Sequence, residues 1–178
     1  MARKKINNED FTPDIPQEIP QAEGEFGAYK IEVDFNIDEE YKPLPLIPQG
    51  TYTGHVTSVK IIPEDPSICW DVTLQGNGGT KSDGSEIDGS TLSFKNWLPK
   101  PGDETKRTKS GLQTVREAKI SFLKEFSERM KINMNTAQIV QEAIANQDWV
   151  GMEVRVKIGI REYEGRYSNN IEMMEAAE

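Results

Sequence analysis

The sequence predicts a mostly β protein with helices (α+β), preceded by an extended N-terminal arm. Short segments rich in β-branched residues alternate apolar and polar side chains between residues 51 and 98, and again from residue 152 onward. A stretch with apolar residues at helical spacing separates these two groups. Six of the ten prolines lie before residue 49. Because proline removes a backbone donor and resists helix and central strand, that end of the chain is expected to stay outside the fold.

Residues 1–43 are expected to form an acidic, proline-rich arm that is partly extended or disordered. They hold 5 basic and 11 acidic side chains and little apolar surface to offset the entropy of ordering. Residues 28–37 alternate apolar and polar side chains, which indicates a strand-like segment able to add to a sheet edge or to another protein. The folded domain is expected to cover residues 44–178.

The first two strands are predicted from turn signals and alternation. Pro48-Gln49-Gly50 is a turn signal, and the β-branched run over residues 51–62 follows it. Residues 68–74 alternate in the same way, with Trp70 on the apolar side. We therefore expect Trp70 to lie in the core.

A glycine-rich loop and a third strand come next. Residues 75–90 contain five glycines and are expected to form a long flexible loop. Residues 91–98 alternate again, which places Lys95 and Trp97 together on the polar side of this strand. An exposed tryptophan at such a position has no packing role.

Two helices are predicted in the middle of the chain. The first covers residues 112–131 with Ser110 as its cap, and the second covers residues 136–146 with Asn135 as its cap. The apolar stripe predicted for the first helix consists of Leu112, Val115, Lys119, Phe122, Leu123, Phe126 and Met130.

The chain ends in a predicted two-stranded hairpin. Residues 152–160 alternate apolar and charged side chains, Glu164-Gly165 supplies the turn, and residues 166–174 return. The predicted elements come in the order of three strands, a helical segment and a hairpin. This order matches a five-stranded OB-type barrel with a helical insertion between the third and fourth strands. A mixed α+β sandwich with a helix on one face would give a similar pattern.

Composition and motifs exclude several kinds of function. One cysteine and one histidine cannot form an internal disulfide or a Cys/His zinc site. The glycines of residues 76–79 are not followed by Gly-Lys-Ser/Thr, and Asp83 to Asp88 lack the spacing of a calcium loop. The apolar runs are too short to span a membrane. We expect no catalytic site, metal or cofactor, no membrane association, and a cytoplasmic location.

Basic and aromatic side chains recur on the polar sides of the predicted strands and in the loop after the third strand. Single-strand binders combine a positive groove with aromatic rings on which bases stack. Residues 95–131 hold 10 basic and 5 acidic side chains, although the whole chain carries a net charge of −9. The candidate nucleic-acid-binding residues are Lys95, Trp97, Lys100, Lys106, Arg107, Lys109, Arg155, Lys157, Arg161, Tyr163, Arg166 and Tyr167.

The same residues also allow purely structural interpretations. Trp97 could cap the end of the barrel, and Tyr163 could pack against Tyr167 across the hairpin. The basic stretch could be a solvated helix of mixed charge.

Four strand and turn segments carry a resemblance to a known family. They are Leu46 to Tyr52, Cys69 to Leu74, Trp149 to Ile158 and Glu162 to Arg166. In these segments the chain resembles phage-encoded OB-fold proteins that are similar to single-stranded DNA-binding proteins, over about residues 44–174. The resemblance implies a viral protein of phage DNA replication or DNA recombination, acting in the host cytoplasm on single-stranded DNA.

A structural role is the alternative prediction. A phage structural or assembly protein could use the same domain for interaction, with the N-terminal arm docking on a neighbouring subunit or another phage protein. The net charge of −9 favours this interpretation over strong DNA binding. An enzyme is the third class considered, and no motif supports it.

Overall fold

A computed structural model describes residues 33, 34 and 36–178 of the chain. The chain divides into two units, Met1–Tyr41 and Lys42–Glu178. In the first unit, α1 (Ile37–Glu40) is a single turn capped by Asn36, whose side chain accepts hydrogen bonds from the backbone of Asp38 and Glu39. The strand-like segment predicted over residues 28–37 lies largely outside the described residues, and the arm stays a prediction.

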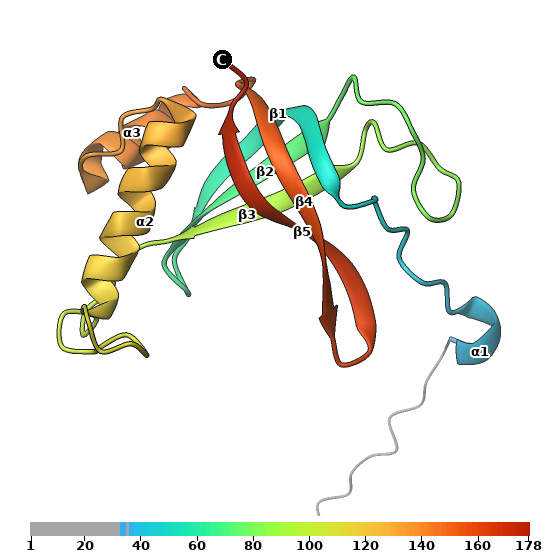
Figure 1. Cartoon of the computed structure of the whole chain (residues 1–178), viewed down its shortest axis with the longest axis horizontal. Coiled ribbons are helices and arrows are strands. Elements are labelled where there is room, and N and C mark those ends of the chain that lie inside the picture. Colours follow the sequence, from blue (N-terminus) through green and yellow to red (C-terminus); the bar gives the residue numbers. More distant parts are fainter. Residues whose placement is uncertain (1–32, 35) are drawn as a thin grey trace, which may run out of the picture. The chain divides into compact units, whose positions relative to one another are not determined.

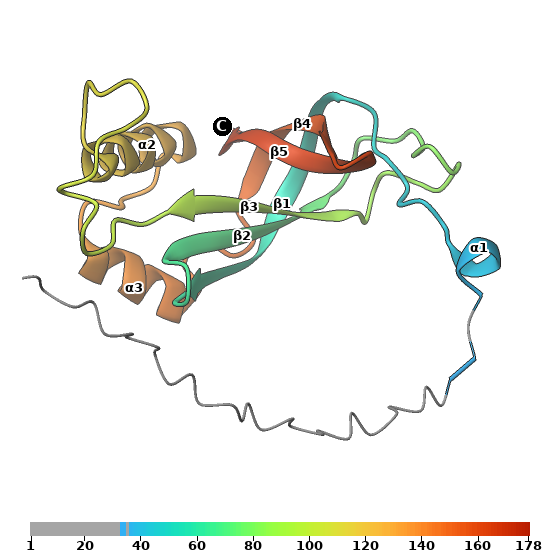
Figure 2. The same cartoon turned by 90° about the horizontal axis from the view of Figure 1, so that it is seen from below.

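The second unit is built on one antiparallel sheet. Its strands are β1 (Gly50–Ile62), β2 (Ser67–Leu74), β3 (Thr91–Trp97), β4 (Glu153–Tyr163) and β5 (Arg166–Ala176), arranged in the order β3-β2-β1-β4-β5. Helices α2 (Val115–Met130) and α3 (Ala137–Asn146) follow β3 and lie at one end of the sheet (Figures 1 and 2). The predicted α+β class, five strands and inserted helices are therefore confirmed.

The sheet is not closed into the predicted barrel. β3 and β5 are the two ends of the strand order, and no ladder of hydrogen bonds joins these two described strands. The two strands nevertheless approach each other, and α2 contacts both of them. A helix that covers strand edges shields their unpaired backbone groups. We call the gap between these strands the β3–β5 seam.

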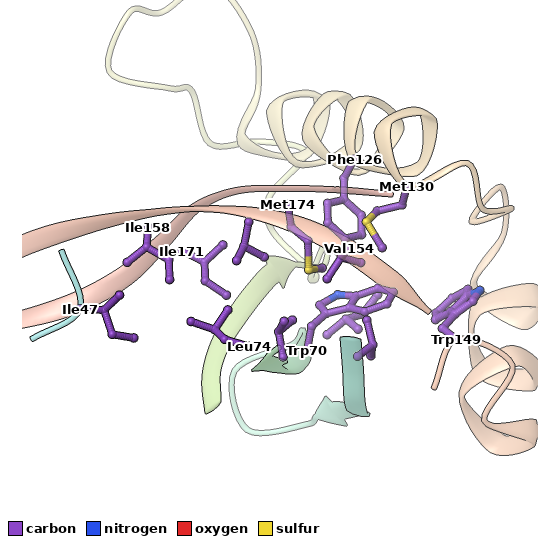
Figure 3. Packing of buried hydrophobic residues seen from close by; sticks show 14 of the residues in the cluster. Ile47, Trp70, Leu74, Phe126, Met130, Trp149, Val154, Ile158, Ile171 and Met174 are labelled. Carbon is purple, nitrogen blue, oxygen red and sulfur yellow. The ribbon is translucent and has the colours of Figure 1, made fainter. Parts of the chain in front are cut away.

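The core lies between the sheet and α2, around Trp70 (Figure 3). The Trp70 ring is fully buried, 5.2 Å from the ring of Phe126 and 5.1 Å from that of Trp149. Its indole N–H donates to the side-chain oxygen of Asn96 at 2.8 Å, which satisfies a polar group that burial would otherwise destabilise. The prediction that Trp70 belongs to the core is confirmed.

Both helices begin later than predicted. Thr114, not Ser110, caps α2: its hydroxyl accepts from the backbone of Glu117, and the Glu117 carboxylate accepts from the backbone of Thr114. Leu112 therefore precedes the helix and is 86% exposed. α3 is likewise capped by Thr136 and not by Asn135.

The glycine-rich loop over residues 75–90, which was predicted to be long and flexible, is held by hydrogen bonds. The Asp88 carboxylate accepts hydrogen bonds from the backbone of Asn77 and Gly78. The side chain of Asn77 in turn donates to the backbone oxygen of Thr53 on β1, and Ile87 is buried. These contacts attach the loop to the sheet at both ends.

The hairpin between β4 and β5 has the predicted turn. Glu164 and Gly165 both have positive φ, 50° and 75°, as a two-residue type I′ turn requires. The register is shifted between Lys157, opposite Met173, and Ile158, opposite Ile171. Glu172 is consequently the extra residue of a β-bulge, a feature that turns a side chain in a new direction.

Candidate nucleic-acid interface

The outer side of β3 presents a stacked cation and aromatic ring. Alternation along this strand turns Phe94 and Asn96 inward, so Lys95 and Trp97 face outward together, as predicted. The Lys95 ammonium nitrogen lies 5.9 Å from the centre of the Trp97 ring, within cation–π range. Trp97 is 47% exposed, and Lys95 forms no ion pair with any residue that the structure describes. Both groups are open to a ligand.

The adjacent face of β2 holds an acidic residue that is already engaged. The Asp71 carboxylate accepts from the Ser93 hydroxyl at 2.6 Å and lies 3.6 Å from the Lys60 ammonium. The Lys60 ammonium thus offsets the negative charge of Asp71, which lies on the strand next to that of Lys95. The negative field that it would present to a phosphate is weakened.

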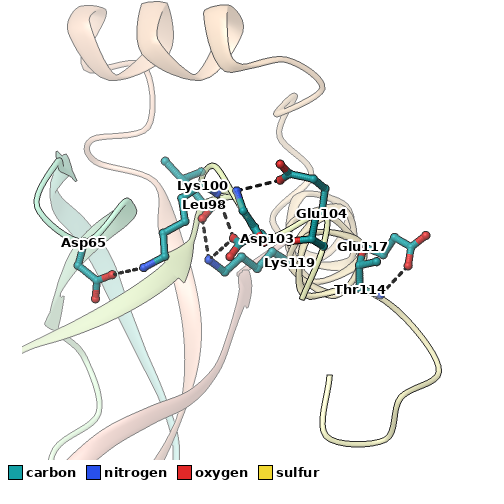
Figure 4. A network of polar contacts seen from close by, with 10 residues as sticks. Asp65, Leu98, Lys100, Asp103, Glu104, Thr114, Glu117 and Lys119 are labelled. Carbon is teal, nitrogen blue, oxygen red and sulfur yellow. Dashed lines mark hydrogen bonds and ion pairs between the residues drawn. The ribbon is translucent and has the colours of Figure 1, made fainter. Parts of the chain in front are cut away.

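A basic loop leaves β3 directly after Trp97 and is held in place by a buried carboxylate (Figure 4). Asp103 accepts from the Lys119 ammonium at 2.8 Å and from the backbone N–H of Lys100 at 3.0 Å. Lys119 also donates to the backbone oxygen of Leu98 at 3.1 Å. The Lys119 hydrogen bond, followed by that of Lys100, lowers the pKa of the Asp103 carboxyl. This anchor ties the first part of the loop, from Leu98 to Asp103, to α2.

The anchored loop carries four of the predicted site residues. Lys100 is close to Asp65, with 3.7 Å between the charged atoms (Figure 4), which moderates its charge. The other three side chains, Lys106, Arg107 and Lys109, are exposed and form no ion pair among the described residues. They supply positive charge in the part of the loop that lies at the start of α2.

A cleft of about 290 Å³ opens between β3, α2 and β5, at the α2 end of the seam. Trp97 lines it from β3 and Phe122 from α2. Phe122 is 66% exposed, whereas the sequence pattern placed it in the buried stripe. The remaining lining residues are Phe94, Lys95, Asn96, Lys119, Leu123, Glu125, Arg129 and Glu172.

A second hollow lies farther along the seam, beside the start of β3. It is lined by Leu44 to Ile47, Lys81, the first residues of β3, and Ser168 and Asn169 of β5. Asn169 fastens one wall, because its amide group accepts from the backbone N–H of Ile47 at 2.7 Å and donates to the backbone oxygen of Ile47 at 2.8 Å. The seam is thus hollowed at both ends.

Two predicted cations of β4 are paired with carboxylates of β5. Arg155 lies 3.3 Å from Glu175, and Lys157 lies 3.0 Å from Glu172. A phosphate would have to compete with these carboxylates. Arg155 and Lys157 are therefore less available to an anion than the sequence indicated.

The hairpin tip separates its four predicted residues between two faces. Tyr163 is opposite Arg166, and Tyr167 is opposite Glu162. Side chains on directly opposed residues share a face, so Arg161, Tyr163 and Arg166 lie on one side and Tyr167 on the other. The two tyrosines, 65% and 54% exposed, do not pack against each other across the hairpin. Tyr163 and its two arginines form a second basic and aromatic patch.

Sequence reasoning missed Phe122, Glu172 and Glu175. Phe122 fits a helical apolar stripe, and only the position of the β3 edge shows that it faces a cleft. The sequence identifies Glu172 and Glu175 as acidic residues, but their ion pairs with Lys157 and Arg155 depend on the β-bulge and on strand register. No sequence signal reports either of these.

Other kinds of site find no support in the described part of the chain. No group of three or more His, Cys, Asp or Glu side chains there is placed to hold a metal ion. No described helix is long and apolar enough to cross a membrane. Neither a family model nor a curated protein sequence matches this chain.

Proposed function

We propose that residues 44–178 bind single-stranded DNA with little sequence preference, as a phage replication or recombination protein would. The observation that carries the proposal is the exposed Lys95–Trp97 pair at the start of the anchored basic loop. Stacking on an aromatic ring is sequence-tolerant because every base has a π face, and lysines beside it neutralise the backbone. We call Lys95, Trp97, Lys100, Lys106, Arg107 and Lys109 the β3 surface.

The strand arrangement supports this assignment. An OB fold is a partly open five-stranded Greek-key barrel, and it binds oligonucleotides on the face of its second and third strands and on the loops that join strands 1 to 2 and strands 4 to 5. The order β3-β2-β1-β4-β5 with helices before β4 fits such a barrel with an open seam. On this basis Lys95 and Trp97 lie on the strand face where an OB fold binds its ligand, and the β4–β5 hairpin is one of the loops that such a fold uses.

The contacts of the predicted residues support an order among them in the proposed site. The β3 surface is the centre of the proposed site, and Arg161, Tyr163 and Arg166 are a second, separate patch at the hairpin. Arg155 and Lys157 contribute less because of their ion pairs. Tyr167 faces the other side of the hairpin from Tyr163.

A salt-series titration of the full chain against a fluorescently labelled oligo-dT tests the proposal. Trp97→Ala is expected to weaken binding by about 1–3 kcal/mol if a base stacks there. Lys106→Gln combined with Lys109→Gln is expected to reduce the slope of log K against log salt by about 0.7 for each phosphate that is no longer neutralised. Lys124→Gln, on α2 outside this surface and paired with Glu128, is the control and should bind as the wild type does.

The alternative, a phage structural or assembly protein, is favoured by the net charge of −9. Deleting residues 1–43 distinguishes the two functions. If the protein is a DNA-binding protein, the shortened chain folds and binds DNA at least as tightly as the full chain, because an anionic segment has been removed. Under the alternative, deletion converts an oligomer into monomers and the full chain does not bind DNA at low salt.

A further inference from the structure

We infer that the cleft between β3 and α2 is a base-binding subsite, in which one nucleobase of the strand stacks between Trp97 and Phe122. This inference rests on the proposed function and assigns a role to Phe122, which the β3 surface does not include. The occupant is a single base and not the phosphate backbone.

The exposure of Phe122 is the first observation behind this inference. On α2, Phe126 and Met130 are fully buried in the core and Lys119 pairs with Asp103, so these residues account for the packing of the helix. Phe122 is 66% exposed and lines the cleft with Trp97. A large apolar ring left in water is unfavourable, and a flat ligand that covers it gains free energy. No packing role in the described unit explains a phenylalanine at this position.

The size of the cleft limits what can enter. Pockets for drug-sized ligands range from about 300 to 1,000 Å³. At about 290 Å³, this cleft is suited to one planar ring system. It adjoins the Lys95–Trp97 pair, so a base inside it remains connected to a strand that follows the β3 surface.

The charged side chains around the cleft favour an uncharged base inside it and the phosphates outside it. Glu125 and Glu172 line the cleft together with Lys95, Lys119 and Arg129. Glu125 is paired with Arg129, Glu172 with Lys157 and Lys119 with Asp103, so among the described residues Lys95 is the one lining cation without an ion pair to offer a phosphate. The exposed cations Lys106, Arg107 and Lys109 lie in the loop and are not among the lining residues. A strand therefore places its phosphates along the loop and an uncharged base between the rings.

Phe122→Ala in the full chain tests the subsite, with fluorescence anisotropy of labelled oligo-dT as the measurement. Removing one stacking ring is expected to weaken affinity about 5- to 150-fold. The salt dependence should not change, because the substitution removes no charge. Phe122→Tyr, which keeps a flat ring, should bind as the wild type does, and Phe122→Leu should resemble Phe122→Ala. Leu112→Ala removes another highly exposed apolar side chain and is the matched control.

An oligonucleotide of abasic sites provides a second measurement. It should bind wild type and Phe122→Ala equally, since it has no base to insert. If Phe122→Ala binds oligo-dT normally while Trp97→Ala does not, the subsite is wrong and the proposed function stands. If Phe122→Leu binds as the wild type does, stacking on the ring is not the cause of the contribution of Phe122 to affinity. If the wild type does not bind oligo-dT at low salt, both proposals fail.

Discussion

Glu172→Gln is expected to strengthen the binding of single-stranded DNA, although it removes an ion pair. The Glu172 carboxylate lies 3.0 Å from the Lys157 ammonium, and the residue also lines the cleft beside Lys95 and Trp97. Replacing the carboxylate by an amide removes one negative charge from the rim of the proposed site. It also frees Lys157 to contact a phosphate.

The size of the effect follows from simple electrostatics. One negative charge about 7 Å from a phosphate contributes about 0.6 kcal/mol of repulsion in water, so removing it should tighten binding about threefold at low salt. If Lys157 then neutralises a phosphate, the slope of log K against log salt should steepen by about 0.7. Both partners of the ion pair are largely exposed, so its removal should cost only about 0.2–1 kcal/mol of stability.

The assay is an anisotropy titration with oligo-dT at several salt concentrations. Glu142→Gln on α3 makes the same change in net charge at a helix that does not line the cleft, and it serves as the control. Its affinity should remain close to that of the wild type. Equal tightening by both variants would show that only net charge matters. Unchanged or weaker binding by Glu172→Gln would refute the proposed position of the strand.

Three further predictions concern stability. Phe126→Ala removes a fully buried ring that contacts Trp70 and is expected to lower the free energy of unfolding by about 3–5 kcal/mol in urea titrations; a decrease below about 1 kcal/mol would contradict the packing of α2. Thr114→Ala removes the hydroxyl of the capping box and should cost about 1 kcal/mol in the same experiment, while Ser110→Ala should cost almost nothing. Because the pKa of the Asp103 carboxyl is lowered in the folded protein, its contribution to stability is present above its ordinary pKa and is lost as the pH falls through the lowered value. Thermal melts of Asp103→Asn should accordingly depend less on acid pH than those of the wild type, and an identical pH dependence would show that the Lys119 hydrogen bond is not the cause.

Local patterns predicted the strands because each strand buries one face more deeply than the other. Alternation placed Trp70 in the core and turned Lys95 and Trp97 outward, and Glu164-Gly165 identified the hairpin. These features depend on residues close together in the sequence. The sheet and its inserted helices were therefore predictable.

The start of α2 was not predictable in the same way because two caps compete. Ser110 with Gln113 and Thr114 with Glu117 both match a capping box. Extending the helix to Ser110 would place Gly111 within its first turn, whereas Gly111 has a φ of 71°. The helix begins at the second cap, and Leu112 stays in the loop.

Long-range features of the candidate site could not be predicted from the sequence either. The open β3–β5 seam depends on how two distant strand edges meet. The pairing of Lys157 with Glu172 depends on a one-residue bulge. Phe122 has the spacing of a core residue, and its exposure follows from the orientation of α2 against β3. The basic loop was predicted from composition, but its Asp103–Lys119 anchor was not.

The central position of β1 has a consequence for the order in which the chain can fold. β1 pairs with β2, which follows it closely, and also with β4, which lies about ninety residues farther along the chain. During synthesis the meander of β1, β2 and β3 can form early, but one edge of β1 has no partner until β4 has been made. An unpaired strand edge is a template for pairing with other chains, and long-range pairing is slow. Partly synthesised chains are thus most vulnerable to aggregation along β1, and the arrival of β4 removes that hazard.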